Sequence, residues 1–295
     1  MSPLLVTYGS SCEALARASA KLAGLKVLET SRRRFPDGEQ YVRVDGDMRG
    51  EDVAVFQSLG LNPDSYLVEY ALIADAIRGA GCRSVTAVVP YLAYARQDKR
   101  FKAGEPLSAK AFARLIERAG TDRIITVDMH LHRFSKVSEV FDIPAVNVSA
   151  MPLIAEHYAK AHRGESVVVV GPDKESEQWA KQVAEALSSR LYILEKERLG
   201  DRDVRVSDVS FGKGSRALLV DDMISTGKTL LEVVSKLKAQ GFSPIDAAAT
   251  HSLLVEGAYA RLTEAGISEL ISTDTVPGPH SAVSVAPILA RAIAP

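Results

Sequence analysis

The stretch Ala217–Thr229 reads ALLVDDMISTGKT, in which an apolar run leads through two adjacent carboxylates into a hydroxyl-rich turn and a helix. In open α/β sheets, ligands bind beyond the carboxyl ends of the strands. Asp221 and Asp222 can accept hydrogen bonds from vicinal ribose hydroxyls, while the first N–H groups of a helix attract a phosphate dianion. The turn residues that would hold this phosphate are Ser225, Thr226, Gly227, Lys228 and Thr229. The stretch therefore predicts a strand–turn–helix unit that binds a ribose phosphate.

This turn has two other interpretations. Gly227-Lys228-Thr229 also matches the end of a Walker A loop, but Asp222 stands where that loop needs its first glycine. An ordinary turn in which Asp, Ser and Thr only cap the helix stays open on this stretch alone. Motifs elsewhere in the chain must decide between capping and ligand binding.

Composition limits the class of protein. The chain has 295 residues, of which 46% are apolar, enough for two domains of about 150 residues with cores of their own. Its 36 basic and 37 acidic side chains give a net charge of -1, which argues against a nucleic-acid partner. Cys12 and Cys82 indicate neither a disulfide framework nor a zinc site. No apolar run approaches the roughly 20 residues of a membrane span, and the N-terminus lacks signal-peptide features. We therefore expect a cytoplasmic protein with no membrane partner.

Short β-branched runs alternate with helical stretches along the chain. A first series runs from LLVTYG near the N-terminus to RIITVDMH, and a second series begins at ESVVVVGPD. Such alternation is typical of parallel sheets with helices on both faces. The sequence thus predicts an α/β protein with two doubly wound units of mainly parallel sheet, joined within residues 142–151.

Five motifs together resemble those of ribose-phosphate diphosphokinases, also called PRPP synthetases, over nearly the whole chain. They are Arg33–Val44 (RRFPDGEQYVRV), Pro90–Lys110, Thr126–His130 (TVDMH), Glu195–Val204 (EKERLGDRDV) and Ala217–Thr229. The resemblance implies two phosphoribosyltransferase-like domains, residues 1–145 and 146–280, and a final helix in residues 281–295 that returns to the first domain. It also implies attack by the 1-hydroxyl of ribose 5-phosphate on the β-phosphorus of ATP, giving 5-phosphoribosyl 1-diphosphate (PRPP) and AMP.

Two motifs are expected to bind ATP. On the residues alone, Asp37-Gly38 indicates a plain hairpin turn, and the Arg96 segment indicates a solvated basic loop. The resemblance implies instead that an adenine is bound across a subunit interface, and therefore at least a homodimer, by Phe35, Asp37, Gly38 and Glu39. It also implies ATP contacts from Arg96, Gln97 and Asp98, where a guanidinium can clamp phosphate.

Metal binding is expected after the run IITV. Asp128 and His130 follow it at i and i+2, so both can lie on one side of a strand. On spacing alone, a loop histidine without a metal is the simpler interpretation. The resemblance implies a magnesium at Asp128 and His130 that bridges the nucleotide phosphates, and a second magnesium at Asp173. Mg2+ is therefore the expected cofactor, since it keeps several waters beside a few protein ligands. Zinc is less expected, because neither cysteine nor a helical histidine spacing supports His132.

The segment Glu195–Asp208 has alternating charges and no apolar stripe, which is typical of an exposed loop. The resemblance implies that Lys196 and Arg198 are catalytic and stabilise the charge that builds on the transferring diphosphoryl group. It also implies that Arg198 contacts ribose 5-phosphate. No residue stands out as a general base.

The chain departs from the resemblance at two places. Pro172–Ser176 reads PDKES where the family commonly has Pro-Asp-x-Gly-Gly, and only Phe141 stands where the bacterial form has paired phenylalanines. These departures point to a divergent branch near the shorter archaeal-type enzymes. Two alternative functions stay open: a type I phosphoribosyltransferase that uses PRPP, and a catalytically silent regulatory partner of a synthetase.

Overall fold

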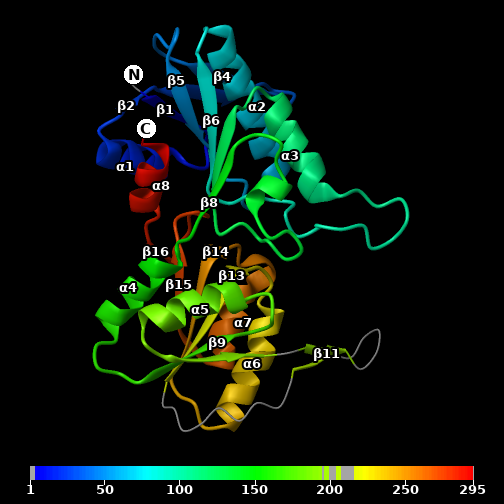
Figure 1. The fold of residues 1–295 in the computed structure, drawn as a ribbon, viewed down its shortest axis with the longest axis vertical. Helices are drawn as coiled ribbons and strands as arrows, with labels where there is room; N and C mark the ends of the chain where they lie inside the picture. Colours follow the sequence, from blue (N-terminus) through cyan, green and yellow to red (C-terminus); the bar gives the residue numbers. More distant parts are fainter. Residues whose placement is uncertain (1–3, 195, 199–203, 207–215, 295) are drawn as a thin grey trace. The chain divides into compact units, whose positions relative to one another are not determined.

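The computed structural model describes residues 4–194, 196–198, 204–206 and 216–294, and gives only the backbone of 196–198 and 204–206. The chain forms two compact units (Figure 1). Unit 1 contains Met1–Ser149 and Ser284–Pro295, and unit 2 contains Ala150–Val283. The seams expected after residues 145 and 280 differ from these boundaries by a few residues.

Unit 1 is built on a parallel sheet with the strand order β2-β1-β5-β6-β7-β8. The strands are β1 (Leu4–Tyr8), β2 (Lys26–Val27), β5 (Asp52–Phe56), β6 (Ser84–Val89), β7 (Arg123–Val127) and β8 (Ala145–Val148). After their first residues, β1, β5 and β7 are buried throughout, as expected for parallel strands covered on both faces. A separate antiparallel hairpin contains β3 (Thr30–Arg34) and β4 (Gln40–Val44).

The helices of unit 1 come from both ends of the chain. They are α1 (Glu13–Ala23), α2 (Pro63–Gly79), α3 (Ser108–Arg118), the 3-10 helix η1 (Val137–Glu139) and α8 (Ala286–Ile293). Helix α8 packs on α1 (Figure 1). Its buried residues repeat at helical spacing and are Ala286, Leu289, Ala290 and Ile293. This apolar face explains why the last helix of the chain belongs to unit 1.

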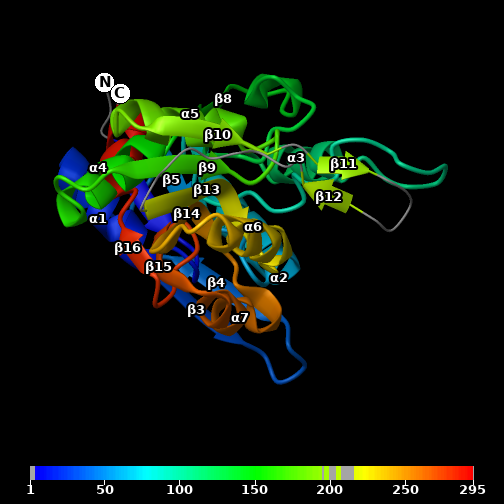
Figure 2. The same ribbon diagram turned by 90° about the horizontal axis from the view of Figure 1, so that it is seen from below.

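Unit 2 repeats the architecture with the parallel strand order β10-β9-β13-β14-β15-β16. The strands are β9 (Val167–Gly171), β10 (Arg190–Ile193), β13 (Arg216–Ile224), β14 (Ile245–Ser252), β15 (Ile267–Thr273) and β16 (Ser281–Val283). The helices are α4 (Met151–Ala161), α5 (Glu177–Ala186), α6 (Lys228–Ala239), η2 (Val255–Gly257) and α7 (Ala258–Ala265). Helices α4 and α5 cover one face of the sheet, and α6 and α7 cover the other (Figure 2).

Alternate residues of β13 enter different hydrophobic cores. Leu218 and Val220 pack in the core that contains Trp179 of α5. Ala217 and Leu219 pack in the opposite core, with residues of α6 and α7. Because side chains alternate across a strand, one continuous apolar run builds both layers. The predicted doubly wound α/β fold is confirmed.

A short antiparallel pair also belongs to unit 2. Strand β11 (Lys196–Arg198) pairs with β12 (Val204–Val206), so that Lys196 stands opposite Val206 and Arg198 opposite Val204. The sequence predicted an exposed loop here, whereas the described backbone forms strands. The side chains of Lys196 and Arg198 lie outside what the structure describes, and their catalytic roles stay predictions.

Candidate active site

Three carboxylates meet near the carboxyl ends of the neighbouring strands β9 and β13. Asp173 follows β9, while Asp221 and Asp222 belong to the last part of β13. The Asp222 N–H donates to Asp221 Oδ1 over 2.9 Å, and Asp222 is buried. Burial, followed by the charges of Asp222 and Asp173, raises the pKa of Asp221 well above its ordinary value. A cation or a pair of hydroxyl donors bound here would relieve this repulsion.

The turn after these carboxylates places a glycine with a left-handed backbone at the start of a helix. Gly227 has φ +72° and comes directly before α6. A Cβ at this position would lie 3.1 Å from Leu262 Cδ1, so the turn packs closely against α7. The first turn of α6 has no acidic residue, and its N–H groups and dipole therefore favour an anion. This geometry is compatible with a bound phosphate, and the ligand contacts of the turn stay predictions.

Arg261 of α7 holds the same turn from a distance in sequence. Its Nη2 donates to the Thr226 carbonyl over 2.9 Å, across 35 residues. Ser225, Thr226 and Thr229 are half-buried and Lys228 is exposed. Sequence reasoning missed Arg261, because no local pattern in α7 indicates a partner so far along the chain.

In Pro172–Ser176, the segment that lacks the two expected glycines, Ser176 forms hydrogen bonds back to Asp173. The buried Ser176 donates its N–H to Asp173 Oδ1 over 3.2 Å and its hydroxyl to the Asp173 carbonyl. Gly171, at the end of β9, has no room for a side chain, since a Cβ would lie 2.7 Å from both Ile193 Cδ1 and Ser176 Oγ. Ser176 thus shapes the turn at the start of α5, and one carboxylate oxygen of Asp173 is already a hydrogen-bond acceptor.

In unit 1, Asp128 and His130 do not continue a strand. Strand β7 ends at Val127, and Asp128 has φ +35°, a left-handed value that is unusual for a non-glycine residue. Asp128 is buried, and its N–H donates to the Val148 carbonyl over 2.9 Å. His130 is half-buried, with its ring 6.5 Å from that of His132. The prediction that Asp128 and His130 lie on one side of a strand is therefore wrong, because the backbone turns at Asp128. The metal-binding roles of both residues stay predictions.

The segment of Arg96, Gln97 and Asp98 is held by its own polar side chains. Ser108 donates its hydroxyl to Gln97 Oε1. Arg133 donates to the buried Asp98 carboxylate twice, through Nη1 over 2.6 Å and through its backbone N–H over 3.0 Å. Arg96 is exposed. Asp98 therefore positions this loop in the structure, and direct ATP contacts by the three predicted residues stay predictions. Arg133 is a second residue that sequence reasoning missed.

The predicted adenine-binding residues form the tip of the β3–β4 hairpin. Phe35 N–H donates to the Glu39 carbonyl over 2.8 Å, Asp37 Oδ1 accepts the Glu39 N–H over 3.1 Å, and Gly38 has φ +97°. The plain hairpin interpretation is thus correct about the local backbone. The Arg33 guanidinium lies 4.3 Å from the centre of the Phe35 ring, while 37% of Phe35 stays exposed. The tip can still present an aromatic surface to a ligand.

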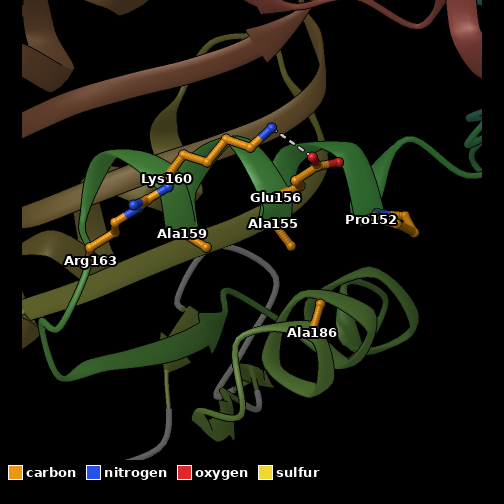
Figure 3. Close-up of a pocket in the computed structure, with 7 residues that line it drawn as sticks. All are labelled: Pro152, Ala155, Glu156, Ala159, Lys160, Arg163 and Ala186. Atoms are coloured by element: carbon orange, nitrogen blue, oxygen red, sulfur yellow. Dashed lines mark hydrogen bonds and ion pairs between the residues drawn. The ribbon is translucent and has the colours of Figure 1, made fainter.

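A hollow of about 420 Å³ lies beside α4 and α5, away from every predicted site residue (Figure 3). Ala155 and Ala159 of α4 point towards Ala186, the last residue of α5. Lys160 Nζ and Glu156 Oε1 form an ion pair 2.6 Å apart at its edge. Arg163 also lines the hollow, and none of the predicted site residues does.

The fold and the carboxylate turn define a phosphoribosyltransferase-like protein. Residues 4–120 match the family model described as the N-terminal domain of ribose phosphate pyrophosphokinase, and residues 136–285 match the phosphoribosyl transferase domain. The chain belongs to the ribose-phosphate pyrophosphokinase family, as its motifs predicted, and is an enzyme that forms PRPP with ATP.

Similar proteins extend over the whole chain. The ribose-phosphate pyrophosphokinase of Methanopyrus kandleri is 40% identical over 98% of this chain and 98% of its own length. Ribose-phosphate pyrophosphokinase 1 of Archaeoglobus fulgidus is 35% identical over 98% of this chain and 100% of its own. The crystal structure of phosphoribosylpyrophosphate synthetase from Mycobacterium smegmatis has a TM-score of 0.88 and 34% identity, covering 99% of this chain and 97% of that one. Within the described residues, no helix combines the length and apolar composition that a membrane crossing requires.

Proposed function

We propose that this chain transfers the diphosphoryl group of ATP to the 1-hydroxyl of ribose 5-phosphate, and that the β13–α6 turn binds the sugar phosphate. The observation that carries this assignment is the juxtaposition of Asp221 and Asp222 with an α6 N-terminus that has no acid in its first turn. The carboxylates accept hydrogen bonds from the ribose hydroxyls, and the helix start receives the 5-phosphate. The remaining contacts of the sugar phosphate come from Ser225, Thr226, Gly227, Lys228, Thr229 and Arg198.

The proposed reaction is an in-line displacement at the β-phosphorus of ATP. The 1-hydroxyl oxygen forms the new bond, the bond to the α-phosphate oxygen breaks, and AMP leaves. Most catalysis of phosphoryl transfer comes from positioning and charge neutralisation. We assign positioning of ATP to the loop of Arg96, Gln97 and Asp98, and charge neutralisation to Lys196 and Arg198.

Mg2+ is the proposed cofactor. We assign one Mg2+ to the Asp128 carboxylate and the His130 nitrogen, with nucleotide oxygens and water as the other ligands, and a second Mg2+ to the Asp173 carboxylate. Burial, together with the charges of Asp222 and Asp173, raises the pKa of Asp221, which is consistent with a cation bound near Asp173. When bound, the metal would neutralise phosphate charge.

The proposed assembly is a homo-oligomer, at least a dimer. Phe35 and Glu39 lie at a hairpin tip with exposed surface, and a tip of this kind can reach a ligand held by a neighbouring copy. Asp37 and Gly38 fix its backbone. The cytoplasmic location expected from the sequence stays a prediction.

The alternative functions differ in the substrate that is consumed. The purified chain is given Mg-ATP with ribose 5-phosphate in one reaction, and PRPP with each common nucleobase in another. We expect AMP release in the first reaction and no PRPP consumption in the second. Consumption of PRPP that requires a nucleobase would replace this proposal by a phosphoribosyltransferase, and inactivity in both reactions would favour a silent regulatory protein.

A further inference from the structure

The amino end of the unit 2 sheet carries a charged cluster that the proposed transfer reaction does not use. Arg216 opens β13, Asp246 is the second residue of β14, and Glu269 is the third residue of β15. Asp246 and Glu269 are neighbours across these two strands. His162 comes directly after α4. The acidic turn that begins at Asp221 lies towards the other end of the same sheet, so the two groups are separate.

His162 lies between two carboxylates. Its Nε2 is 2.9 Å from Glu269 Oε2, and its Nδ1 is 3.5 Å from Glu165 Oε1. The imidazole also packs against Tyr158, with ring centroids 4.3 Å apart. These contacts fix the imidazole with both nitrogens directed at negative groups.

Asp246 is fully buried beneath this histidine. Its Oδ2 accepts hydrogen bonds from the Tyr158 hydroxyl, over 2.7 Å, and from Arg216 Nη1. Burial and the hydrogen bond to Asp246 raise the pKa of Tyr158, which stays protonated and can only donate to the carboxylate. Among the described residues, Asp246 Oδ1 has no hydrogen-bond partner, although the residue is 0% exposed. A buried carboxylate oxygen without a donor is costly, so a positively charged ligand at this position would be stabilising.

The charge of the cluster also favours a cation. Glu165, Asp246 and Glu269 contribute three carboxylates, and Arg216 is the fixed cation that contacts two of them, with Nε 2.7 Å from Glu165 Oε2. The three carboxylates outnumber this one arginine. A bound metal ion would offset the excess of negative charge.

We infer that His162, Asp246 and Glu269 form a binding site for a divalent transition-metal ion such as Zn2+. One ligand atom from each of the three residues lies within 4.8 Å of the others. Ligand atoms at zinc bond lengths of about 2.0–2.2 Å lie roughly 3.3–3.6 Å apart around a tetrahedral ion, so the widest separation in the set must close by about 1 Å when the metal binds. Zinc takes imidazole nitrogen and carboxylate oxygens in a four-coordinate site, whereas magnesium needs an octahedral set and keeps several waters. A water would be the fourth ligand.

The test measures binding of Zn2+ and Co2+ to the whole, metal-stripped enzyme by calorimetry and by cobalt absorption, with excess Mg2+ present. His162→Gln and Glu269→Gln each remove one ligand, and the Glu269 side chain is 39% exposed, so its replacement perturbs the core little. His157→Gln on the same helix and Glu264→Gln in α7 are matched controls outside the cluster. We expect one bound ion in wild type and both controls, at least about tenfold weaker binding in the two ligand variants, and unchanged turnover with Mg-ATP in all four.

The measurement can contradict the inference in two ways. Equal affinity in wild type and in Glu269→Gln would show that the ion binds elsewhere. An absence of wild-type binding, apart from competition at the magnesium sites, would refute the inference. Both results leave the proposed transfer activity untouched, because that activity is measured separately.

Discussion

Asp221 of β13 lies close enough to Asp173, which follows the neighbouring strand β9, for the Asp173 charge to raise the pKa of Asp221. The parallel pairing of β9 with β13 brings the two residues together from positions 48 apart in the sequence. Repulsion between carboxylates destabilises the unliganded fold. Clustered carboxylates of this kind are typical of sites that bind cations or polyhydroxyl ligands.

The raised pKa predicts how stability depends on pH. Since the pKa of Asp221 is higher in the folded protein than its ordinary value of about 4, its contribution to stability is complete below that value and is lost as pH rises above it. Asp221→Asn cannot lose a proton, so we expect it to exceed wild type in free energy of unfolding, by a margin that grows as pH rises. Urea unfolding at a series of pH values measures this difference. The exposed Glu264→Gln should follow wild type, and parallel curves for Asp221→Asn and wild type would refute the coupling.

Two glycines flank α6, and their replacement by alanine should have different effects on stability and on ribose 5-phosphate binding. Gly227 and Gly241 stand at opposite ends of α6, and both have positive φ, +72° and +83°. Alanine in the left-handed region costs about 1–2 kcal/mol. A Cβ at Gly227 also meets Leu262 at 3.1 Å, while the space at Gly241 is open. We expect Gly227→Ala to lose more stability than Gly241→Ala and, unlike it, to raise the KM for ribose 5-phosphate. Equal KM values in both variants would remove Gly227 from the binding turn.

If the Arg133–Asp98 contact fixes the predicted ATP-binding loop, loss of the Arg133 side chain should weaken ATP binding. Arg133→Ala removes the guanidinium hydrogen bond to the buried Asp98 carboxylate and keeps only the bond from the backbone N–H of residue 133, so the loop should lose its fixed shape. Because Arg133 itself is partly exposed, we expect a loss of about 1 kcal/mol in unfolding free energy and a several-fold higher KM for ATP. Arg114→Ala, an exposed arginine of α3, is the matched control. Steady-state kinetics with ATP as the varied substrate measures the effect, and an unchanged KM would separate this loop from ATP binding.

The proposed catalytic role of Lys196 predicts that its replacement lowers kcat and leaves ATP affinity nearly unchanged. If its ammonium acts on the charge that develops during transfer, Lys196→Ala should lower kcat by about 10²–10³, with the Kd of ATP within a few-fold of wild type. Lys181→Ala, on the exposed face of α5, should behave as wild type. Single-turnover kinetics with separate ATP binding by calorimetry checks both quantities. Wild-type turnover by Lys196→Ala would exclude the proposed role.

The sequence predicted best what depends on local pattern. The β13–α6 turn follows from a continuous apolar run, two aspartates and a glycine, and both doubly wound cores follow from alternation along strands such as β13. The positive φ of Asp128 could not be predicted in this way, because spacing rules assume that a strand continues. Arg261 and Arg133 were missed for a different reason: each supports a loop 35 residues away in sequence, and only the folded chain brings the partners together.

The account is tested most directly by the amounts of AMP and PRPP that the purified chain forms from Mg-ATP with and without ribose 5-phosphate. We expect equal amounts of the two products, formed only when the sugar phosphate is present, and a strong reduction of both in Asp221→Asn. Failure to form PRPP at any magnesium and phosphate concentration, or AMP release that does not depend on ribose 5-phosphate, would contradict the assigned transfer reaction.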